Sequence, residues 1–260
     1  MPVFTDQLNR PVELLTTPKR IVSLVPSQTE LLHYLQLEQE VAGITKFCVH
    51  PNAWFKTKTR VGGTKAVKMD ILHQLQPDLV LANKEENVKE QVEEIARQYP
   101  TWISDINTLD DALAMIKQVG LVTGKSEPAI TLTEKITAAF TSLQPAAHKP
   151  RACYLIWQHP YMTIGGDTFI HDMLNRCGFN NMFGNVTRYP ETTIEELKKA
   201  NCQLLLLSSE PFPFKQKHIP ELQAQLPDTK IRLADGEYFS WYGSRLLQAP
   251  GYFKELIAEI

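Results

Sequence analysis

The chain has 260 residues, of which 43% are hydrophobic and 22% are charged, and its formal net charge is −2. A chain of this size and composition folds as one large globular domain or as two smaller lobes. Because 27 basic residues nearly balance 29 acidic ones, no overall field attracts nucleic acid or anionic lipid. No stretch reaches the ~20 apolar residues of a membrane span. We therefore expect no nucleic-acid partner and no membrane-spanning segment.

The first ten residues, MPVFTDQLNR, contain neither the apolar segment nor the small-residue cleavage site of a secretory signal. We expect a cytoplasmic protein as the sequence is written, or a periplasmic one if a signal peptide has been removed. The four cysteines are far apart and lack CxxC or zinc-ribbon spacing, so we expect them to be reduced. Cys153 and Cys202 are expected in the core, inside strands.

Strands and helices alternate along the first part of the chain. A polar turn at 6–10 indicates an opening hairpin, and Ser27 is predicted to cap the first helix, with Glu30 at the third helical position. The predicted strands are 20–26, 41–44, 78–82 and 101–104; the predicted helices are 28–37, 70–75, 85–98 and 108–120; a long loop is expected at 45–61.

The alternation restarts after one helical stretch, 126–143, which the prolines at 145 and 150 end. The predicted strands that follow are 151–157, 203–208 and 230–233, and the predicted helices are 168–177, 193–200 and 244–258.

Strands that alternate with helices predict parallel βαβ units in both halves. The expected fold class is α/β, with two Rossmann-like lobes whose sheets are mainly parallel. One long rigid helix joins the lobes, and a ligand cleft lies between them. We assign residues 1–124 to the N-terminal lobe, 125–148 to the linking helix and connector, and 149–260 to the C-terminal lobe.

Segments from both halves resemble one known family. The first half contains RPVELLTTPKRIVSLVPSQTELLHYLQLEQEVAGIT and VGGTKAVKMDILHQLQPDLVLA, and the second contains YMTIGGDTFIHDMLNRCGFNNMF and TTIEELKKANCQLLLLSS. They are similar to the class III (helical-backbone) periplasmic binding proteins of ABC importers, which include receptors for vitamin B12, haem and ferric siderophores. The resemblance implies non-covalent capture of a metal chelate by a monomer, without a covalent cofactor, and docking on an ABC permease.

The resemblance also implies one acidic docking residue at the start of a short helix in each lobe. The matching positions in this chain are Asp70 and Glu195, with Glu196 as the alternative register.

Ligands of open α/β lobes meet the loops at the carboxyl ends of the strands. In this chain those loops are rich in aromatic, cationic and carboxylate side chains, which suit a large polar or chelated ligand. The candidate ligand-binding residues are Ser27, Lys46, Cys48, His50, Lys84, Trp157, Tyr161, Arg188, Glu210, Trp241, Tyr242 and Arg245. Ser27 either only caps its helix or also helps its backbone N–H groups to hold an anion.

A weaker hypothesis places a metal on this set. Cys48 and His50 combine a soft and a borderline ligand on one loop, and a metal site would need two more donors, which Glu210, Glu237 or His159 could supply. The alternative is that His50 is a packed or surface histidine.

Of the candidate segments, Trp241-Tyr242-Gly243-Ser244-Arg245 most strongly indicates ligand binding. Its rings could stack on a flat macrocycle while Arg245 holds an anionic group. The alternative is a tryptophan packed into the lobe interface and a surface arginine.

The sequence has no GxSxG, HExxH, Walker or GxGxxG motif, so we do not expect an enzyme. The function predicted is a substrate-binding protein for a corrinoid, haem or ferric siderophore. The alternatives are a cytoplasmic metal- or corrinoid-handling protein and a chelatase-like enzyme.

Overall fold

The computed structural model describes residues 2–260, and the chain divides into two compact units. Unit 1 comprises Met1–Ile106, Asp110–Lys135 and Tyr242–Arg245. Unit 2 comprises Asn107–Leu109, Ile136–Trp241 and Leu246–Ile260. Each unit is an α/β structure built on a parallel sheet, as the alternating pattern predicts.

Unit 1 contains a five-stranded sheet in the order β5-β4-β3-β8-β9, and every neighbouring pair is parallel. Its strands are β3 (Ile21–Ser23), β4 (Val41–Ile44), β5 (Thr59–Arg60), β8 (Leu79–Asn83) and β9 (Thr101–Ser104). Its helices are α1 (Pro26–Tyr34), α2 (Asn52–Thr57), α3 (Met69–Leu75), α4 (Lys89–Ala96) and α5 (Leu109–Val122). Two small hairpins complete it, β1 (Val3–Thr5) with β2 (Pro11–Glu13) and β6 (Gly62–Gly63) with β7 (Ala66–Val67).

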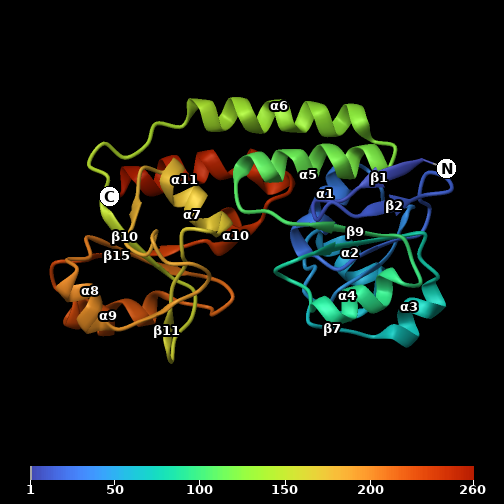
Figure 1. The fold of residues 1–260 in the computed structure, drawn as a ribbon. Helices are drawn as coiled ribbons and strands as arrows, with labels where there is room; N and C mark the ends of the chain where they lie inside the picture. The colour runs from blue at the N-terminus through green and yellow to red at the C-terminus, as the bar shows by residue number, and fades with distance from the viewer. Residues whose placement is uncertain (1) are drawn as a thin grey trace. The chain divides into compact units, whose positions relative to one another are not determined.

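Helices cover both faces of this sheet. Figure 1 shows α3 and α4 on one side of the strands and α1 and α5 on the other. Leu72 of α3 and Ile95 of α4 pack in one cluster with Val22 and Val80 of the central strands. All five residues of β8 are buried, which explains its continuous apolar run, because a parallel strand covered on both faces has no polar side.

Unit 2 contains a four-stranded parallel sheet in the order β12-β10-β14-β15. Its strands are β10 (Arg151–Leu155), β12 (Asn180–Asn181), β14 (Leu204–Ser208) and β15 (Lys230–Ala234). A separate two-stranded antiparallel sheet pairs β11 (Tyr161–Met162) with β13 (Glu191–Thr192). Its helices are α7 (Phe169–Arg176), α8 (Ile194–Lys199), α9 (Ile219–Gln225), α10 (Gly236–Ser240) and α11 (Ala249–Ala258), with a 3₁₀ turn at Gln216–His218.

The core of unit 2 also lies on both faces of its sheet. Leu197 of α8 and Leu222 of α9 pack against Leu205 and Leu207 of β14. In Figure 1 these two helices lie on one side of the strands, and α7, α10 and α11 lie on the other. On that second side Tyr154 contacts Phe239 of α10, with 5.0 Å between ring centroids.

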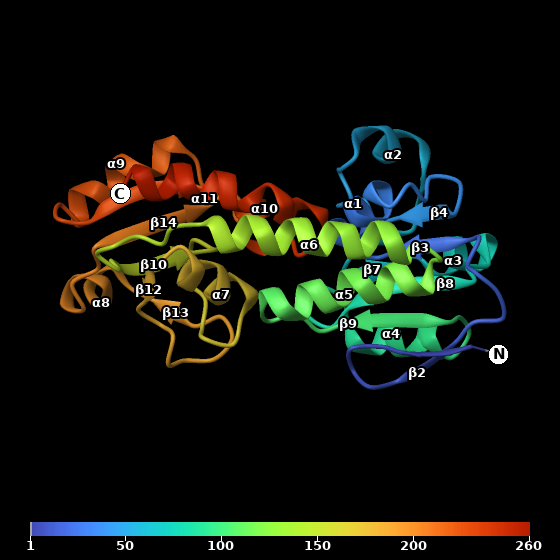
Figure 2. The ribbon, with the colours of Figure 1, turned by 90° about the horizontal axis from the view of Figure 1, so that it is seen from above.

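Helix α6 (Ser126–Ser142) is continuous, and the division between the units falls after Lys135, within it. In unit 1 it runs beside α5, as Figure 2 shows, and a Cβ on Gly120 would lie 2.3 Å from the Cβ of Ala129. A glycine is therefore required for this close approach. In unit 2 the ring of Phe140 packs edge-on against Phe253, with 6.3 Å between centroids. Within residues 2–260, every helix is too short or too polar to cross a bilayer.

Four local predictions were wrong, and the first is the start of the helix predicted at 85–98, which begins only at Lys89 as α4. The predicted loop 45–61 contains α2 and β5, because Trp54 is only 1% exposed and anchors a short helix. Ser27 does not cap α1: Pro26 begins the helix after Val25, which makes no side-chain capping bond, and proline is favoured in the first turn. The predicted helix 244–258 is a 3₁₀ turn, Ser244–Leu247, followed by α11.

Candidate functional site

The loops after β10 and β14 form an aromatic surface at the carboxyl end of the unit 2 sheet. Trp157 follows β10, and 41% of it is exposed. Its ring lies edge-on to Phe212, which follows β14, with 5.8 Å between centroids. Phe212 in turn contacts the buried Phe214 at 4.7 Å. We call Trp157, Phe212 and Phe214 the aromatic cluster.

Backbone bonds hold this cluster in place. The amide of Phe212 donates to the carbonyl of Ile156 at 3.2 Å, which ties the two loops together. The ring of His218 contacts both Phe212 and Phe214, at 5.8 and 5.5 Å between centroids. An exposed indole on a fixed support can stack on a flat ligand without first being ordered. The sequence singled out Trp157 but not Phe212, although the Pro-Phe-Pro-Phe run after β14 was a usable signal.

Tyr161 lies in β11 of unit 2, and Arg188 lies shortly before β13, the strand that pairs with β11. Tyr161, in β11, is half-buried, and its ring is 6.3 Å from that of His159. Burial raises the pKa of the Tyr161 hydroxyl, although a hydrogen bond with Gln158 opposes this. Arg188 is exposed, and its guanidinium carbon lies 5.5 Å from the ring centroid of Tyr189.

The side chains of Glu210 and Trp241 form a hydrogen bond with each other and do not face open solvent. Glu210 Oε1 accepts from the hydroxyl of Ser240 at 2.6 Å and from Nε1–H of Trp241 at 3.1 Å. Burial raises the pKa of Glu210, the bonds from Ser240 and Trp241 lower it, and the charge of Glu237 adds to the rise. Trp241 is only 7% exposed, so the structure favours the packed alternative for this ring.

Tyr242 and Arg245 belong to unit 1, where we call residues 242–245 the strap. The Tyr242 hydroxyl donates to Glu86 Oε1 at 2.7 Å, and burial raises its pKa, with the charge of Glu86 as the next cause. Arg245 binds Glu30 through two nitrogens, at 2.6 and 3.2 Å. The predicted surface arginine is therefore a largely buried ion-pair partner.

In unit 1, the loop after β4 contains Lys46, Cys48 and His50. Lys46 is exposed, with Nζ 5.0 Å from the ring centroid of Phe47, and His50 is half-buried. Cys48 is fully buried, and its Sγ lies 3.1 and 3.2 Å from the hydroxyls of Thr29 and Thr45.

The surroundings of Cys48 do not favour a metal ligand. Burial raises the pKa of the Cys48 thiol, whereas a metal ligand must be a thiolate. Among residues 2–260, three or more His, Cys, Asp or Glu side chains never gather as a metal site would require. The assignment of Cys48, His50 and Glu210 as metal ligands stays a prediction that nothing in the described residues of either unit supports.

The other predicted residues of unit 1 occupy distinct settings. Ser27 is buried within the first turn of α1. Lys84 is exposed and binds Asp105, with 2.6 Å between Nζ and Oδ2. Among the described residues, no contact between the side chains of Ser27 and Lys84 is recorded.

The two predicted docking acids are both exposed and both lie in the first turn of a helix, Asp70 in α3 and Glu195 in α8. Glu196, the residue after Glu195, completes a capping box with Thr193. Oε2 of Glu196 accepts from the backbone amide of Thr193 at 3.0 Å, and Oγ1 of Thr193 accepts from the backbone amide of Glu196. Glu196 therefore caps the helix, whereas Glu195 takes no part in the capping box.

Two α/β units with parallel sheets, divided within one long helix, define a two-lobed binding protein of the helical-backbone type. The sequence model of the periplasmic binding protein family matches residues 21–228. The chain belongs to the periplasmic binding protein family. The resemblance and the fold class that the sequence indicates are both confirmed.

Known proteins agree with this assignment. The chain is 25% identical over 217 residues to a vitamin B12-binding protein of Vibrio parahaemolyticus, covering 80% of this chain and 76% of that protein. The periplasmic vitamin B12-binding protein BtuF of Vibrio cholerae has the same fold, with a TM-score of 0.76, 17% identity and coverage of 94% and 98%. So does the periplasmic haem-binding protein HutB of that organism, with a TM-score of 0.78, 18% identity and coverage of 92% and 98%.

Proposed function

We propose that this protein is a non-enzymatic receptor that captures a metal chelate, a corrinoid, haem or ferric siderophore, for an ABC importer. The observation that carries the proposal is the aromatic cluster. It presents a 41% exposed indole at the carboxyl end of a parallel sheet, where α/β proteins bind ligands. The vitamin B12-binding and haem-binding relatives support a chelate as the ligand class.

The chemistry of the cluster suits a large, flat ligand. Aromatic rings prefer offset or edge contacts with another π-system, and they bury much area at little entropic cost. The exposed Arg188 and His159 on nearby loops offer polar contacts for the rim of a macrocycle or a chelate. Capture needs no bond-making step, since these residues only bind and orient the ligand.

Transport requires a second contact, with a permease. Asp70 and Glu195 are exposed carboxylates on the two units, and paired acids of this kind steer a partner that presents cations. We infer a monomer, and we infer that it works outside the cytoplasmic membrane because the vitamin B12-binding and haem-binding proteins of the same fold are periplasmic.

Titration tests the proposal directly. Purified protein is titrated with cyanocobalamin, haem and ferrichrome while tryptophan fluorescence is recorded. We expect one of these probes to quench the fluorescence of Trp157 saturably, with a stoichiometry of one. The Trp157→Ala variant should bind the same probe more weakly. If none of the three binds saturably, the ligand class is wrong.

A further inference from the structure

A polar pocket of about 470 Å³ lies in unit 2, lined by residues from its sheet edge and its helices. This volume falls within the range of small-molecule sites. Arg151 opens β10 and pairs with Asn180 of the edge strand β12, whereas Trp157 follows the opposite end of β10. Four strand steps of ~3.3 Å place the two ends about 13 Å apart. The pocket is therefore separate from the aromatic cluster.

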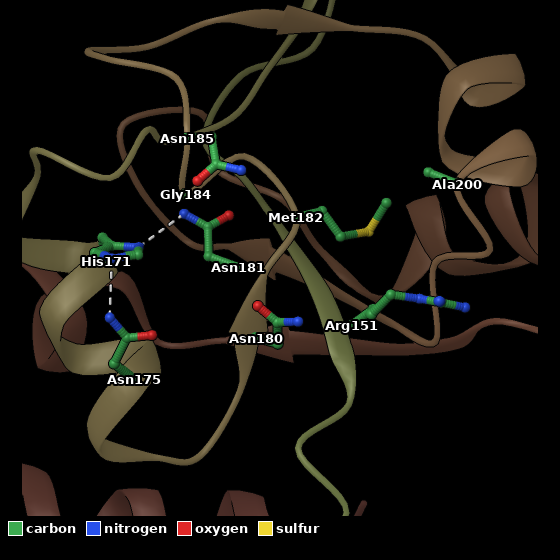
Figure 3. Close-up of a pocket in the computed structure, with 9 residues that line it drawn as sticks. All are labelled: Arg151, His171, Asn175, Asn180, Asn181, Met182, Gly184, Asn185 and Ala200. Atoms are coloured by element: carbon green, nitrogen blue, oxygen red, sulfur yellow. Dashed lines mark hydrogen bonds between the residues drawn. The ribbon is translucent and has the colours of Figure 1, made fainter.

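One wall of the pocket is held rigid by Asn181 (Figure 3). Its Nδ2 donates to the carbonyl of Ile164 at 3.1 Å, and its Oδ1 accepts from the amide of Phe183 at 3.0 Å. These two bonds fix which end of the amide faces His171, because a flipped amide would lose both of them. Nδ2 of Asn181 therefore donates to Nδ1 of His171, 3.1 Å away.

This bond sets the protonation of the imidazole. With Nδ1 as acceptor, the proton of neutral His171 lies on Nε2, which is 2.9 Å from the side-chain amide of Asn175. The structure places Nδ2 of Asn175 at this distance, and because two donors cannot bond to each other, we infer that this amide is turned so that its oxygen accepts from Nε2–H. Protonating Nδ1 would point an N–H at the NH₂ of Asn181, and burial lowers the pKa of His171. His171 thus contributes a neutral, oriented ring.

The pocket carries one positive charge and no carboxylate. Arg151 donates through Nε to the carbonyl of Asn201 at 3.1 Å, and among the described residues it forms no ion pair. Figure 3 shows its side chain and that of Met182 extending toward Ala200. Its two terminal nitrogens can bind one carboxylate bidentately.

Two further amides lie along the pocket. Asn180 and Asn185 are exposed, and within residues 2–260 neither side chain has a recorded hydrogen bond. Each amide offers a donor and an acceptor, which is the pattern that a hydroxyl group can satisfy from both sides.

We propose that this pocket is a second binding site, which takes a small polyhydroxylated monocarboxylate such as a sugar acid. Arg151 binds the carboxylate, and the amides of Asn180 and Asn185 bind hydroxyl groups. Met182 and Ala200 contact the carbon skeleton. A single guanidinium opposite a neutral imidazole matches one negative charge.

Methyl NMR tests the site. The whole chain is labelled at the methionine methyl groups, and the Met182 signal is identified by its loss in Met182→Leu. Gluconate, glucose and sulfate are the probes. We expect gluconate to shift the Met182 signal saturably, with glucose and sulfate at least tenfold weaker, because each lacks one half of the recognised chemistry.

Variants tie the effect to the pocket. Arg151→Gln should weaken gluconate at least tenfold, and Arg151→Lys, which keeps the charge but not the bidentate geometry, should be intermediate and serves if Arg151→Gln does not fold. Arg97→Gln, which removes an exposed arginine after α4 in unit 1, should have no effect, and neither should Trp157→Ala.

The proposal is overturned by any of three outcomes. These are no saturable shift with gluconate, equal gluconate affinity in Arg151→Gln and the parent, or sulfate or glucose binding as tightly as gluconate. Equal binding of sulfate would show a simple anion site, and equal binding of glucose would show that the charge plays no part.

Discussion

The indole Nε1–H of Trp241 donates to Oε1 of Glu210 at 3.1 Å. A buried ring and a half-buried carboxylate therefore join the loop after β14 to the end of α10, within unit 2. Ser240 donates to the same oxygen at 2.6 Å. A carboxylate that accepts two bonds and still has a raised pKa must be strongly desolvated.

Stability should fall as this carboxyl ionises. Because burial raises the pKa of Glu210 above 4.5, its stabilising contribution is complete below the pKa of the unfolded chain and is lost as pH rises through the higher folded value. We expect Glu210→Gln, which keeps an acceptor for Trp241, to melt like the parent near pH ~4 and at a higher temperature near pH ~7. Thermal unfolding followed by circular dichroism across this range measures the difference. A gap that is constant with pH, or equal to that of Glu255→Gln, would contradict it.

The strap should stabilise unit 1 through its ion pair. Arg245 and Glu30 are only 13% and 22% exposed in their side chains, so the pair is well shielded from water. We expect Arg245→Gln to lower the free energy of unfolding by ~1.5–3 kcal/mol, the usual range for hydrogen bonds to charged groups. The exposed Lys89–Glu93 pair is the control, and Lys89→Gln should cost less than ~0.5 kcal/mol. Urea denaturation measures both losses, and equal losses would show that the Arg245–Glu30 pair stabilises the protein no more than an exposed ion pair does.

Local sequence signals predicted most of the fold. The apolar runs of β8 and β14 identify strands buried on both faces, because a parallel strand covered by helices on both sides has no polar side. The helix predicted at 193–200 is α8, and a capping box of Thr193 and Glu196 fixes where it begins.

Contacts between distant residues escaped prediction. The strap residues Tyr242 and Arg245 bind partners 156 and 215 positions away, and no local period encodes such a pairing. An aromatic pair before a helix therefore looked available for stacking. Cys48 misled in the same way, since its burial depends on Thr29, on another element. The loop after β10 was predictable, because a strand end fixes which residues leave the sheet.

Trp157 should matter for binding and little for stability. It is 41% exposed, so truncating it leaves no core cavity. We expect Trp157→Ala to weaken the binding of the chelate that the parent binds by ~1–3 kcal/mol, through lost stacking and buried area, with an unchanged melting temperature. Tyr34→Ala, which removes a similarly exposed ring from unit 1, is the matched control. Unchanged affinity in Trp157→Ala would place the ligand away from the aromatic cluster.

Glu195 and Glu196 are adjacent in sequence, but we expect only Glu196 to stabilise the fold. Glu196 accepts bonds from the Thr193 amide and the Thr192 hydroxyl, so Glu196→Ala should lower the free energy of unfolding by ~0.5–2 kcal/mol, as the loss of a helix cap does. Glu195 is exposed, and Glu195→Ala should leave stability unchanged.

Docking on a permease should depend on Asp70 and Glu195. The double variant Asp70→Lys and Glu195→Lys should slow association with the cognate permease at least tenfold and reduce its salt dependence, because steering charges act mainly on the association rate. Glu90→Lys and Glu255→Lys reverse one exposed acid in each unit and control for net charge. Surface plasmon resonance on permease in nanodiscs measures the rates. If the control pair slows association as much as the docking pair, the effect comes from overall charge, and neither Asp70 nor Glu195 is a docking residue.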